Sequence, residues 1–135
     1  MHGYGGSGIV FYRLFHQLSL HYHVILCDLL GMGRSSRPTF SCKDEFETED
    51  FFVLAFEKWR IEMNLQHMVL LGHSFGGFIC GRYSARYPEH VVKVIFISSL
   101  GVDKAPDNPQ ECVTRLMNKQ PLLQRSIFRI YRCLP

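Results

Sequence analysis

The sequence contains no apolar run that could cross a membrane and no sign of an export signal. A transmembrane helix needs about 20 consecutive apolar residues, whereas the run at 91–97 is far shorter and is interrupted by Lys93. The chain opens on glycines and polar residues instead of a basic stretch followed by an apolar one, so we expect no secretory signal peptide. A cytoplasmic globular protein is expected, and peripheral contact with a lipid surface stays open.

Closely spaced cysteine pairs are also lacking. The odd number of cysteines and their irregular spacing argue against a closed disulfide framework, so reduced thiols are expected. The nearest arrangement to a metal-binding pair is His21-Tyr22-His23, which has no second pair beside it and is interpreted as surface structure. We expect neither a metal nor a cofactor. The cysteines are Cys27, Cys42, Cys80, Cys112 and Cys133.

Neither sign of charge dominates the chain. The 135 residues are 47% hydrophobic and 20% charged, which is ordinary for a globular protein, and the net charge of +3 is too small to indicate nucleic-acid binding. The charge is unevenly distributed, because the residues from Lys104 onward carry +4 and all earlier residues together carry −1.

Loop and helix signals open the chain. Residues 2–8 are too rich in glycine for a helix or strand interior and predict a loop. The spacing of Phe11, Leu14, Phe15 and Leu18 predicts a short helix with one buried face.

The middle of the chain predicts a strand, a loop and an acidic helix. Residues 23–29 hold a short β-branched run, which favours a strand buried on both faces. A loop rich in glycine and serine follows at 31–38, and Ser41 to Asp44 fits a capping box at the start of the next helix. The predicted core face of that helix consists of Phe52, Phe56, Trp59 and Met63.

Two further strands enclose a helix. Residues 68–71 predict a buried strand, the next helix runs to about Arg86 and is stopped before Pro88, and 91–98 predict a third strand. Strands that alternate with helices indicate βαβ units, so the fold class is α/β with a parallel sheet flanked by helices.

A Gly-x-Ser-x-Gly pattern stands at 72–76, directly between the predicted strand and helix. In that setting it is typical of a sharp turn that lifts a serine hydroxyl above a parallel sheet, because the glycines remove Cβ atoms that would clash where strand and helix cross. Ser74 is therefore predicted to be a nucleophile. The N–H of Phe75, at the helix N-terminus, is predicted to donate to an oxyanion. The supporting motif residues are Gly72, His73, Gly76 and Gly77.

A second oxyanion donor is predicted in the run His2-Gly3-Tyr4-Gly5-Gly6. It is similar to loops in which the residue after a His-Gly pair supplies a backbone N–H, and that residue is Tyr4. A flexible glycine-rich start or a weak phosphate loop are the alternatives, although the Lys-Ser/Thr of a P-loop is missing.

Three stretches in this order resemble the α/β-hydrolase superfamily: residues 2–6, Asp-Leu-Leu-Gly-Met-Gly-Arg-Ser-Ser-Arg-Pro at 28–38, and residues 72–77. The 28–38 run and the segment 56–60 are similar to the subfamily of the N-acyl-phosphatidylethanolamine lysophospholipase and the lipid-droplet co-activator of triglyceride lipase. The resemblance covers about residues 2–101. It implies a serine esterase or lipase that acts on an acyl lipid or carboxylic ester through an acyl-enzyme, and a structural role for the loop that begins at Asp28.

The resemblance leaves two alternatives. The co-activator carries asparagine in place of the nucleophile, so Ser74 favours an enzyme, and a non-catalytic scaffold or lipase regulator is the second interpretation. An acyltransferase is the third, because it differs only in passing the acyl group to an alcohol. His23 and Asp28 also match an acyltransferase spacing, which is interpreted as coincidence because alternate strand residues face opposite sides.

The resemblance places the acid and the histidine of a triad later than the strand at 91–98 and beyond Pro135. Asp103 and His90 are the nearest substitutes, and neither is expected to activate Ser74. A further strand is expected before the loop at 2–8. We therefore expect a chain that is incomplete at both ends and is poorly soluble and inactive by itself.

Residues 1–102 are thus predicted to form a partial hydrolase core, and 103–135 a linker and the start of a helical cap. The last part is interpreted as an ordinary cap helix with a solvated basic face, with a lid helix at a lipid interface as the alternative. The expected partner is an acyl ester or lipid substrate, without nucleic acid. The apolar side of that helix comprises Leu123, Ile127, Ile130, Tyr131 and Leu134, flanked by Arg125, Arg129 and Arg132.

Overall fold

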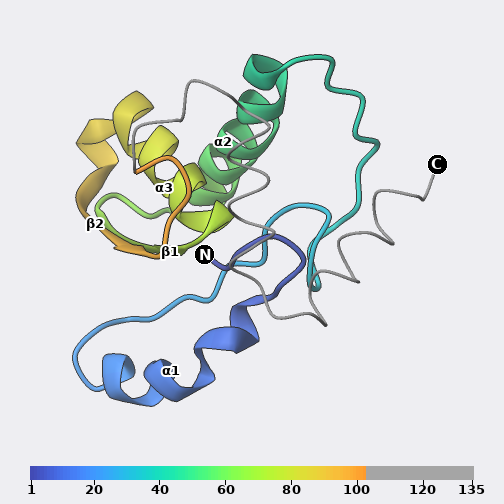
Figure 1. Ribbon diagram of the computed structural model, residues 1–135. Coiled ribbons are helices and arrows are strands. Elements are labelled where there is room, and N and C mark those ends of the chain that lie inside the picture. The colour runs from blue at the N-terminus through green and yellow to red at the C-terminus, as the bar shows by residue number, and fades with distance from the viewer. Residues whose placement is uncertain (103–135) are drawn as a thin grey trace. The chain divides into compact units, whose positions relative to one another are not determined.

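The computed structural model describes residues 1–102, and the predicted linker and cap at 103–135 lie outside the described part. The division into core and cap therefore stays a prediction. The described residues form an α/β arrangement (Figure 1). In chain order the elements are η1 (Gly8–Phe11), α1 (Tyr12–Ser19), α2 (Glu45–Glu62), β1 (Met68–His73), α3 (Phe75–Arg86), η2 (Pro88–His90) and β2 (Val91–Ile97).

The predicted parallel pairing is confirmed for β1 and β2, which α3 connects. Leu70 lies opposite Val94 and Gly72 opposite Phe96 in the ladder, so the two strands end at the same edge. The predicted end of the helix near Arg86 is also confirmed, because the last turn of α3 is followed by Pro88 in η2.

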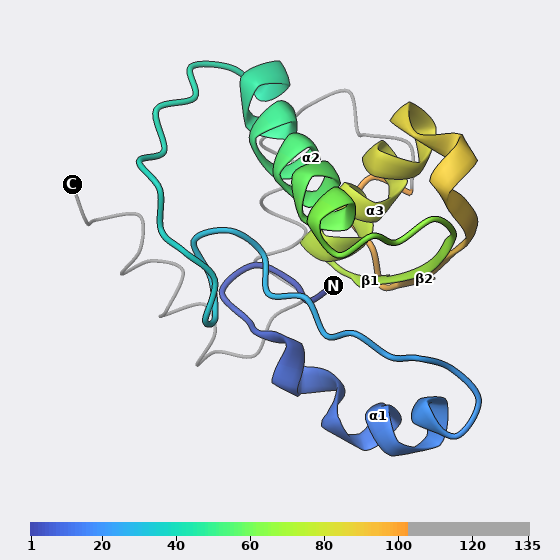
Figure 2. The same ribbon diagram turned by 180° about the vertical axis from the view of Figure 1, so that it is seen from behind.

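The core forms where α2 and α3 pack together beside β1, as Figures 1 and 2 show. Phe56 is buried and contacts the ring of Tyr83, with centroids 4.7 Å apart. Phe52 and Trp59 pack partly buried against this core, as predicted, but Met63 is 47% exposed because it lies just beyond the end of α2. The other buried members are Leu29, Val53, Leu70, Ile79 and Cys80.

A polar network that the sequence did not predict joins α2 to α3. The guanidinium of Arg60 donates to both carboxylate oxygens of Glu57 at 2.8 Å, and the hydroxyl of Tyr83 donates to one of them at 2.6 Å. The hydrogen bonds from Arg60 lower the pKa of Glu57 to about 2. Ion pairs of Arg82 with Glu49 and of Arg86 with Asp50 reinforce the same contact between the helices.

The cap of α2 lies three residues later than predicted. Asp44, in extended conformation, accepts the N–H of Glu47 at 2.8 Å, and the Glu47 carboxylate accepts the N–H of Lys43 at 2.8 Å. The predicted box at Ser41 was wrong because Asp44 satisfies the first-turn donors itself.

Residues 23–29 do not form the predicted strand. No strand within residues 1–102 pairs with them, and His23 and Leu26 are exposed, so the predicted burial on both faces is wrong. Strand formation depends on a hydrogen-bonded neighbour, which a local pattern does not reveal.

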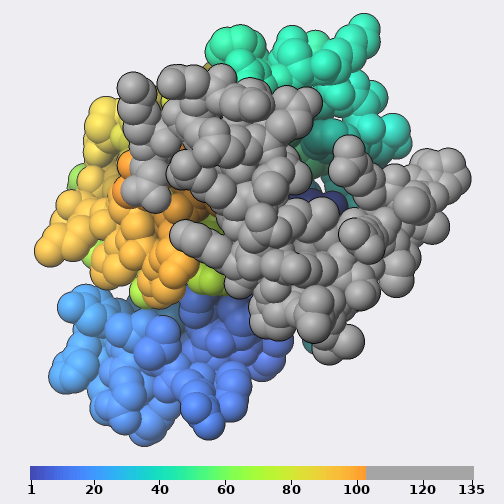
Figure 3. Space-filling model, in the orientation of Figure 1, coloured from blue at the N-terminus to red at the C-terminus, as the bar shows by residue number. Residues whose placement is uncertain are grey.

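The first helix forms, but its predicted buried face is only partly right. Phe11 is buried, whereas Leu14 is 45% and Phe15 40% exposed, and no residue of α1 is buried. Figures 1 and 2 show α1 apart from α2 and α3, and the surface of the N-terminal segment is visible in Figure 3.

Within the described residues, no helix is both long and apolar enough to cross a membrane, and no group of three metal-ligating side chains occurs. Cys27, Cys42 and Cys80 are free thiols. Burial raises the pKa of Cys27 and of Cys80 to about 11, so both are protonated at neutral pH.

Candidate active site

Ser74 stands between β1 and α3 in a backbone conformation that is rare for a residue with a side chain. Its φ is 52° and its ψ is −119°. Its N–H donates to the carbonyl of Ile97 at 3.1 Å, and its own carbonyl accepts the N–H of Leu100 at 3.1 Å. The surrounding chain therefore holds the strained turn in place.

Glycines allow three segments to meet at this turn. A Cβ atom on Gly72 would lie 2.5 Å from the Cα of Gly77, so strand and helix could not cross as they do. A Cβ on Gly76 would overlap the carbonyl oxygen of His2. The glycines predicted around Ser74 thus allow both α3 and the N-terminal loop to pack closely against the turn.

The N-terminal loop reaches Ser74 itself. A Cβ on Gly3 would lie 3.0 Å from the Cβ of Ser74 and 3.1 Å from Nδ1 of His73, so the loop backbone lies against both residues. The loop turns through a hydrogen bond from Gly6 N–H to the carbonyl of Gly3 at 3.1 Å, with Gly5 at a φ of 69°.

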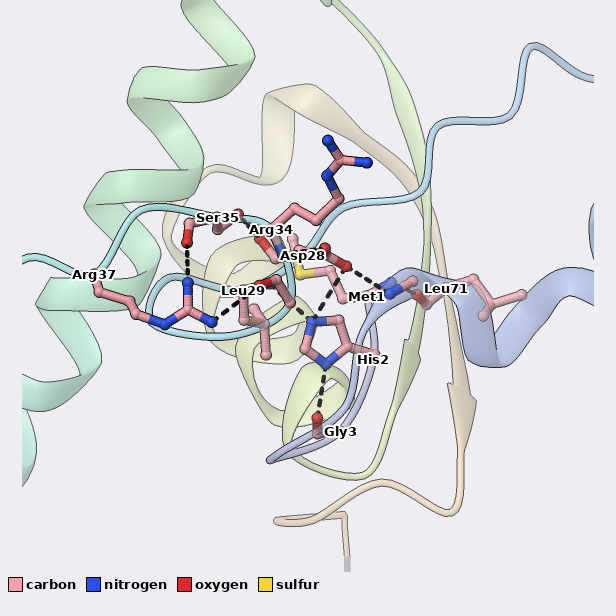
Figure 4. A network of polar contacts seen from close by, with 11 residues as sticks. Met1, His2, Gly3, Asp28, Leu29, Arg34, Ser35, Arg37 and Leu71 are labelled. Atoms are coloured by element: carbon pink, nitrogen blue, oxygen red, sulfur yellow. Dashed lines mark hydrogen bonds and ion pairs between the residues drawn. The ribbon is translucent and has the colours of Figure 1, made fainter.

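Met1 continues the hydrogen-bond ladder on the side of β1 away from β2. Its amino group donates to the carbonyl of Leu71 at 2.6 Å, and its carbonyl accepts the N–H of His73 at 3.0 Å (Figure 4). This is the pattern of one parallel pairing step, and it aligns the loop with the end of β1.

His2 is fully buried, and its imidazole makes hydrogen-bond contacts with the N-terminal loop and with Leu29 (Figure 4). The N–H of Leu29 donates to its Nε2 at 3.0 Å, while its Nδ1 lies 2.7 Å from the carbonyl oxygen of Gly3. Nε2 must be unprotonated to accept, so Nδ1 carries the proton and donates to Gly3. The neutral imidazole thereby connects the loop to the segment at 29.

The carboxylate of Asp28 accepts hydrogen bonds from two other segments of the chain, at Gly8 and at Arg34. It accepts the N–H of Gly8 at 2.5 Å and that of Arg34 at 2.8 Å, and its Oδ1 lies 3.7 Å from Nε2 of His2. The backbone hydrogen bonds, that from Arg34 foremost, lower the pKa of Asp28. The carboxylate is fully engaged by the backbone, as a structural loop requires.

Tyr4 follows Gly3 in the N-terminal loop, and Phe75 follows Ser74 as the first residue of α3. No residue in the range 1–102 accepts a hydrogen bond from the N–H group of either, and their rings meet edge to face with centroids 6.5 Å apart. Two such donors beside a serine could bind an oxygen that acquires negative charge. Their role as an oxyanion hole stays a prediction.

No acid or base is brought to Ser74 by the described part of the chain. His90 precedes β2, at the end of the sheet opposite Ser74, and its Nδ1 lies 3.3 Å from the carbonyl of Gln66. Asp103 lies outside the described residues. No side chain within 1–102 makes a hydrogen bond to the Ser74 hydroxyl.

Sequence reasoning named His2 only as a motif residue and missed its two hydrogen bonds. The contribution of Met1 to the ladder was also missed. Both depend on segments more than 25 residues apart, and the one local signal was the histidine next to the glycine run.

The chain is similar to known proteins over nearly its whole length. Residues 1–129 match the family model described as the alpha/beta hydrolase fold. A 1-acylglycerol-3-phosphate O-acyltransferase of Arabidopsis thaliana is 44% identical over 115 residues, which is 85% of this chain and 28% of that protein. A (lyso)-N-acylphosphatidylethanolamine lipase of Mus musculus is 42% identical over 111 residues, which is 82% of this chain and 32% of the lipase.

Among solved structures, a 2-hydroxy-6-oxo-6-phenylhexa-2,4-dienoate hydrolase from a Rhodococcus species gives a TM-score of 0.71 at 22% identity. The match covers 87% of this chain and 42% of that one. The chain spans about a third or less of the length of the curated relatives named above. On the family match and the shared fold, the chain belongs to the α/β-hydrolase fold family.

Proposed function

We propose that the chain carries the nucleophile and oxyanion hole of a serine esterase or lipase acting on an acyl lipid or other carboxylic ester. The observation that supports this most is the positive φ of Ser74 at the strand-to-helix turn, because such strain persists only where surrounding structure enforces it. The family match supports the hydrolase class.

In the proposed reaction, Oγ of Ser74 attacks the ester carbonyl carbon and its proton passes to a base. The carbonyl oxygen becomes an oxyanion beside the N–H groups of Tyr4 and Phe75. The C–O bond to the alcohol then breaks, the alcohol leaves with a proton, and the acyl group stays on Ser74 until water releases it as an acid. The resemblance assigns neither the base nor the acid to a residue in the range 1–102.

Acyl transfer is a second candidate, because the 44% identical plant relative is named a 1-acylglycerol-3-phosphate O-acyltransferase. An acyltransferase would form the same acyl-enzyme, and an alcohol would replace water as the acceptor of the acyl group.

A non-catalytic regulator is the third candidate, since no described residue activates Ser74.

We also propose that the protein works in the cytoplasm, with peripheral contact at a lipid surface through the basic C-terminal segment.

The test uses protein expressed from the complete reading frame. An alkyl fluorophosphonate should label Ser74, and p-nitrophenyl ester hydrolysis should vanish in Ser74→Ala. Ser84→Ala, on the helix that follows the turn, should retain the hydrolysis. Hydrolysis that persists in Ser74→Ala would contradict the nucleophile assignment. Adding a lysophosphatidic acid acceptor separates the enzymes, since a transferase yields the diacyl product and a hydrolase the free acid. A folded protein that is not labelled by the fluorophosphonate and that neither hydrolyses the ester nor transfers its acyl group would support the non-catalytic regulator.

A further inference from the structure

The loop that follows β2 packs against the turn that carries Ser74, and it contains two adjacent serines with different surroundings. The hydroxyl of Ser99 donates to the carbonyl of Gly72 at 3.2 Å, so it reaches the residue two positions before Ser74. Ser98 is exposed, and its hydroxyl makes no hydrogen bond within residues 1–102. The proposed reaction uses neither hydroxyl, yet that of Ser99 is bound to the turn.

The side chain of Ser99 also lies against α3 on the far side of the turn. A Cβ atom on Gly77 would overlap Oγ of Ser99 and would lie 2.5 Å from its Cβ, so this side chain occupies the space that Gly77 leaves open. Gly72 belongs to β1 and Gly77 to α3. One small polar side chain therefore packs against both the strand that leads into Ser74 and the helix that follows it.

The backbone of the same loop is joined to the backbone of Ser74. The N–H of Ser74 donates to the carbonyl of Ile97, and the carbonyl of Ser74 accepts the N–H of Leu100, both at 3.1 Å. Ser98, which lies between these two partners, has a positive φ of 44°. A serine keeps such a conformation only where its surroundings enforce it. The hydrogen bond of Ser99 is the side-chain contact that fixes the loop next to this strained residue.

We propose that Ser99 is a positioning residue for Ser74, and that its hydrogen bond to the Gly72 carbonyl fixes the direction of the nucleophilic hydroxyl. The proposal rests on the proposed function, because the attack of Ser74 on an ester is the step that the contact serves. Ser99 acts on the backbone of the turn and donates no hydrogen bond to the Ser74 hydroxyl. A displacement of about 1 Å at a reacting group can cost about 100-fold in rate. A contact that adds little to stability can therefore control the rate of attack.

The first test compares native protein from the complete reading frame with Ser99→Ala. Loss of the hydroxyl should lower kcat for p-nitrophenyl butyrate about tenfold and leave KM within about twofold, because Ser99 does not bind the ester. The rate of labelling by an alkyl fluorophosphonate should fall by a similar factor, since it also reports attack by Ser74. Ser98→Ala removes the same atom one residue away and is the matched control, which should keep the native kcat, KM and labelling rate.

Ser99→Cys covers the case that Ser99→Ala fails to fold. The cysteine side chain still fills the space beside Gly77, and its thiol is only a weak donor, so its kcat should lie below the native value and above that of Ser99→Ala. A native kcat in folded Ser99→Ala or in Ser99→Cys would overturn the proposal. A rise in KM with an unaltered kcat would overturn it as well, because that result would assign Ser99 to binding.

Amide hydrogen exchange tests the contact without any turnover. The N–H of Ser74 should exchange about tenfold faster in Ser99→Ala than in native protein and at the native rate in Ser98→Ala. If native protein is neither labelled nor active, the esterase is contradicted, and faster exchange in Ser99→Ala still supports the hold of Ser99 on the turn. Unaltered exchange in that protein would overturn the hold. Hydrolysis at the native rate in Ser99→Ala would overturn the positioning role and keep the esterase.

Discussion

The N–H of Ser74 donates to the carbonyl of Ile97 across 3.1 Å, which ties the strained turn to the last residue of β2. The carbonyl of the same serine accepts the N–H of Leu100. Both backbone groups of Ser74 are thus fixed by chain more than 20 residues away. The turn keeps its positive φ because relaxation would break these bonds.

Replacing Ser74 by glycine should stabilise the fold. Glycine adopts a positive φ without a clashing Cβ, so we expect Ser74→Gly to raise the free energy of unfolding by about 1 kcal/mol while removing the hydroxyl. Urea denaturation measures this. Ser84→Gly, in the interior of α3, should lower it by about 1 kcal/mol, and a similar loss in both variants would contradict strain at Ser74.

Two glycines near the turn should respond in opposite ways to alanine. A methyl on Gly72 meets the backbone of Gly77 at 2.5 Å, so Gly72→Ala should destabilise by about 3 kcal/mol. A methyl on Gly81 would contact the Phe96 ring at 3.5 Å, an ordinary distance. Gly81→Ala should therefore stabilise α3 by up to about 1 kcal/mol. Thermal unfolding of both variants compares them, and equal shifts would refute the argument.

Removing the imidazole of His2 should loosen the loop at 2–6. His2→Ala leaves the N–H of Leu29 without its acceptor in a buried site, which costs about 2 kcal/mol. Amide hydrogen exchange should quicken at Gly6, whose N–H closes the loop. His16→Ala, on the exposed surface of α1, is the matched control and should alter neither stability nor exchange.

Acid should weaken the contact between α2 and α3. The pKa of Glu57 is 4.5 when unperturbed and about 2 in the fold, so its stabilising contribution is complete above about 4.5 and declines as the pH falls toward 2. The free energy of unfolding of the native chain should then approach that of Glu57→Gln over this window. Glu62→Gln, at the exposed end of α2, should show no such convergence.

The elements around Ser74 were predictable because their signals are local. An apolar run, a Gly-x-Ser-x-Gly turn and a proline stop are all present within residues 68–88, and β1 and α3 follow them. The N-cap of α2 was predicted at Ser41 and lies at Asp44, because both side chains can accept a hydrogen bond from a backbone N–H and they are three residues apart. Only the folded loop reveals which one the helix uses.

The segment at 23–29 and the burial of His2 could not be predicted in the same way. A β-strand forms only where a second strand accepts and donates its backbone hydrogen bonds, and the residues of one segment do not show whether such a strand lies beside it. The imidazole of His2 is oriented by the N–H of Leu29, 27 residues away. Arg60 is similar, since its burial depends on Glu57 and on the position of Tyr83 in another helix.

The positive φ at position 74 also constrains how this lineage can change. Glycine, asparagine and aspartate tolerate such a conformation far better than β-branched residues do. Descendants that lose the hydroxyl should therefore accumulate those three residues, because each preserves the turn. Selection for the fold alone would keep a recognisable turn long after selection for chemistry had ceased.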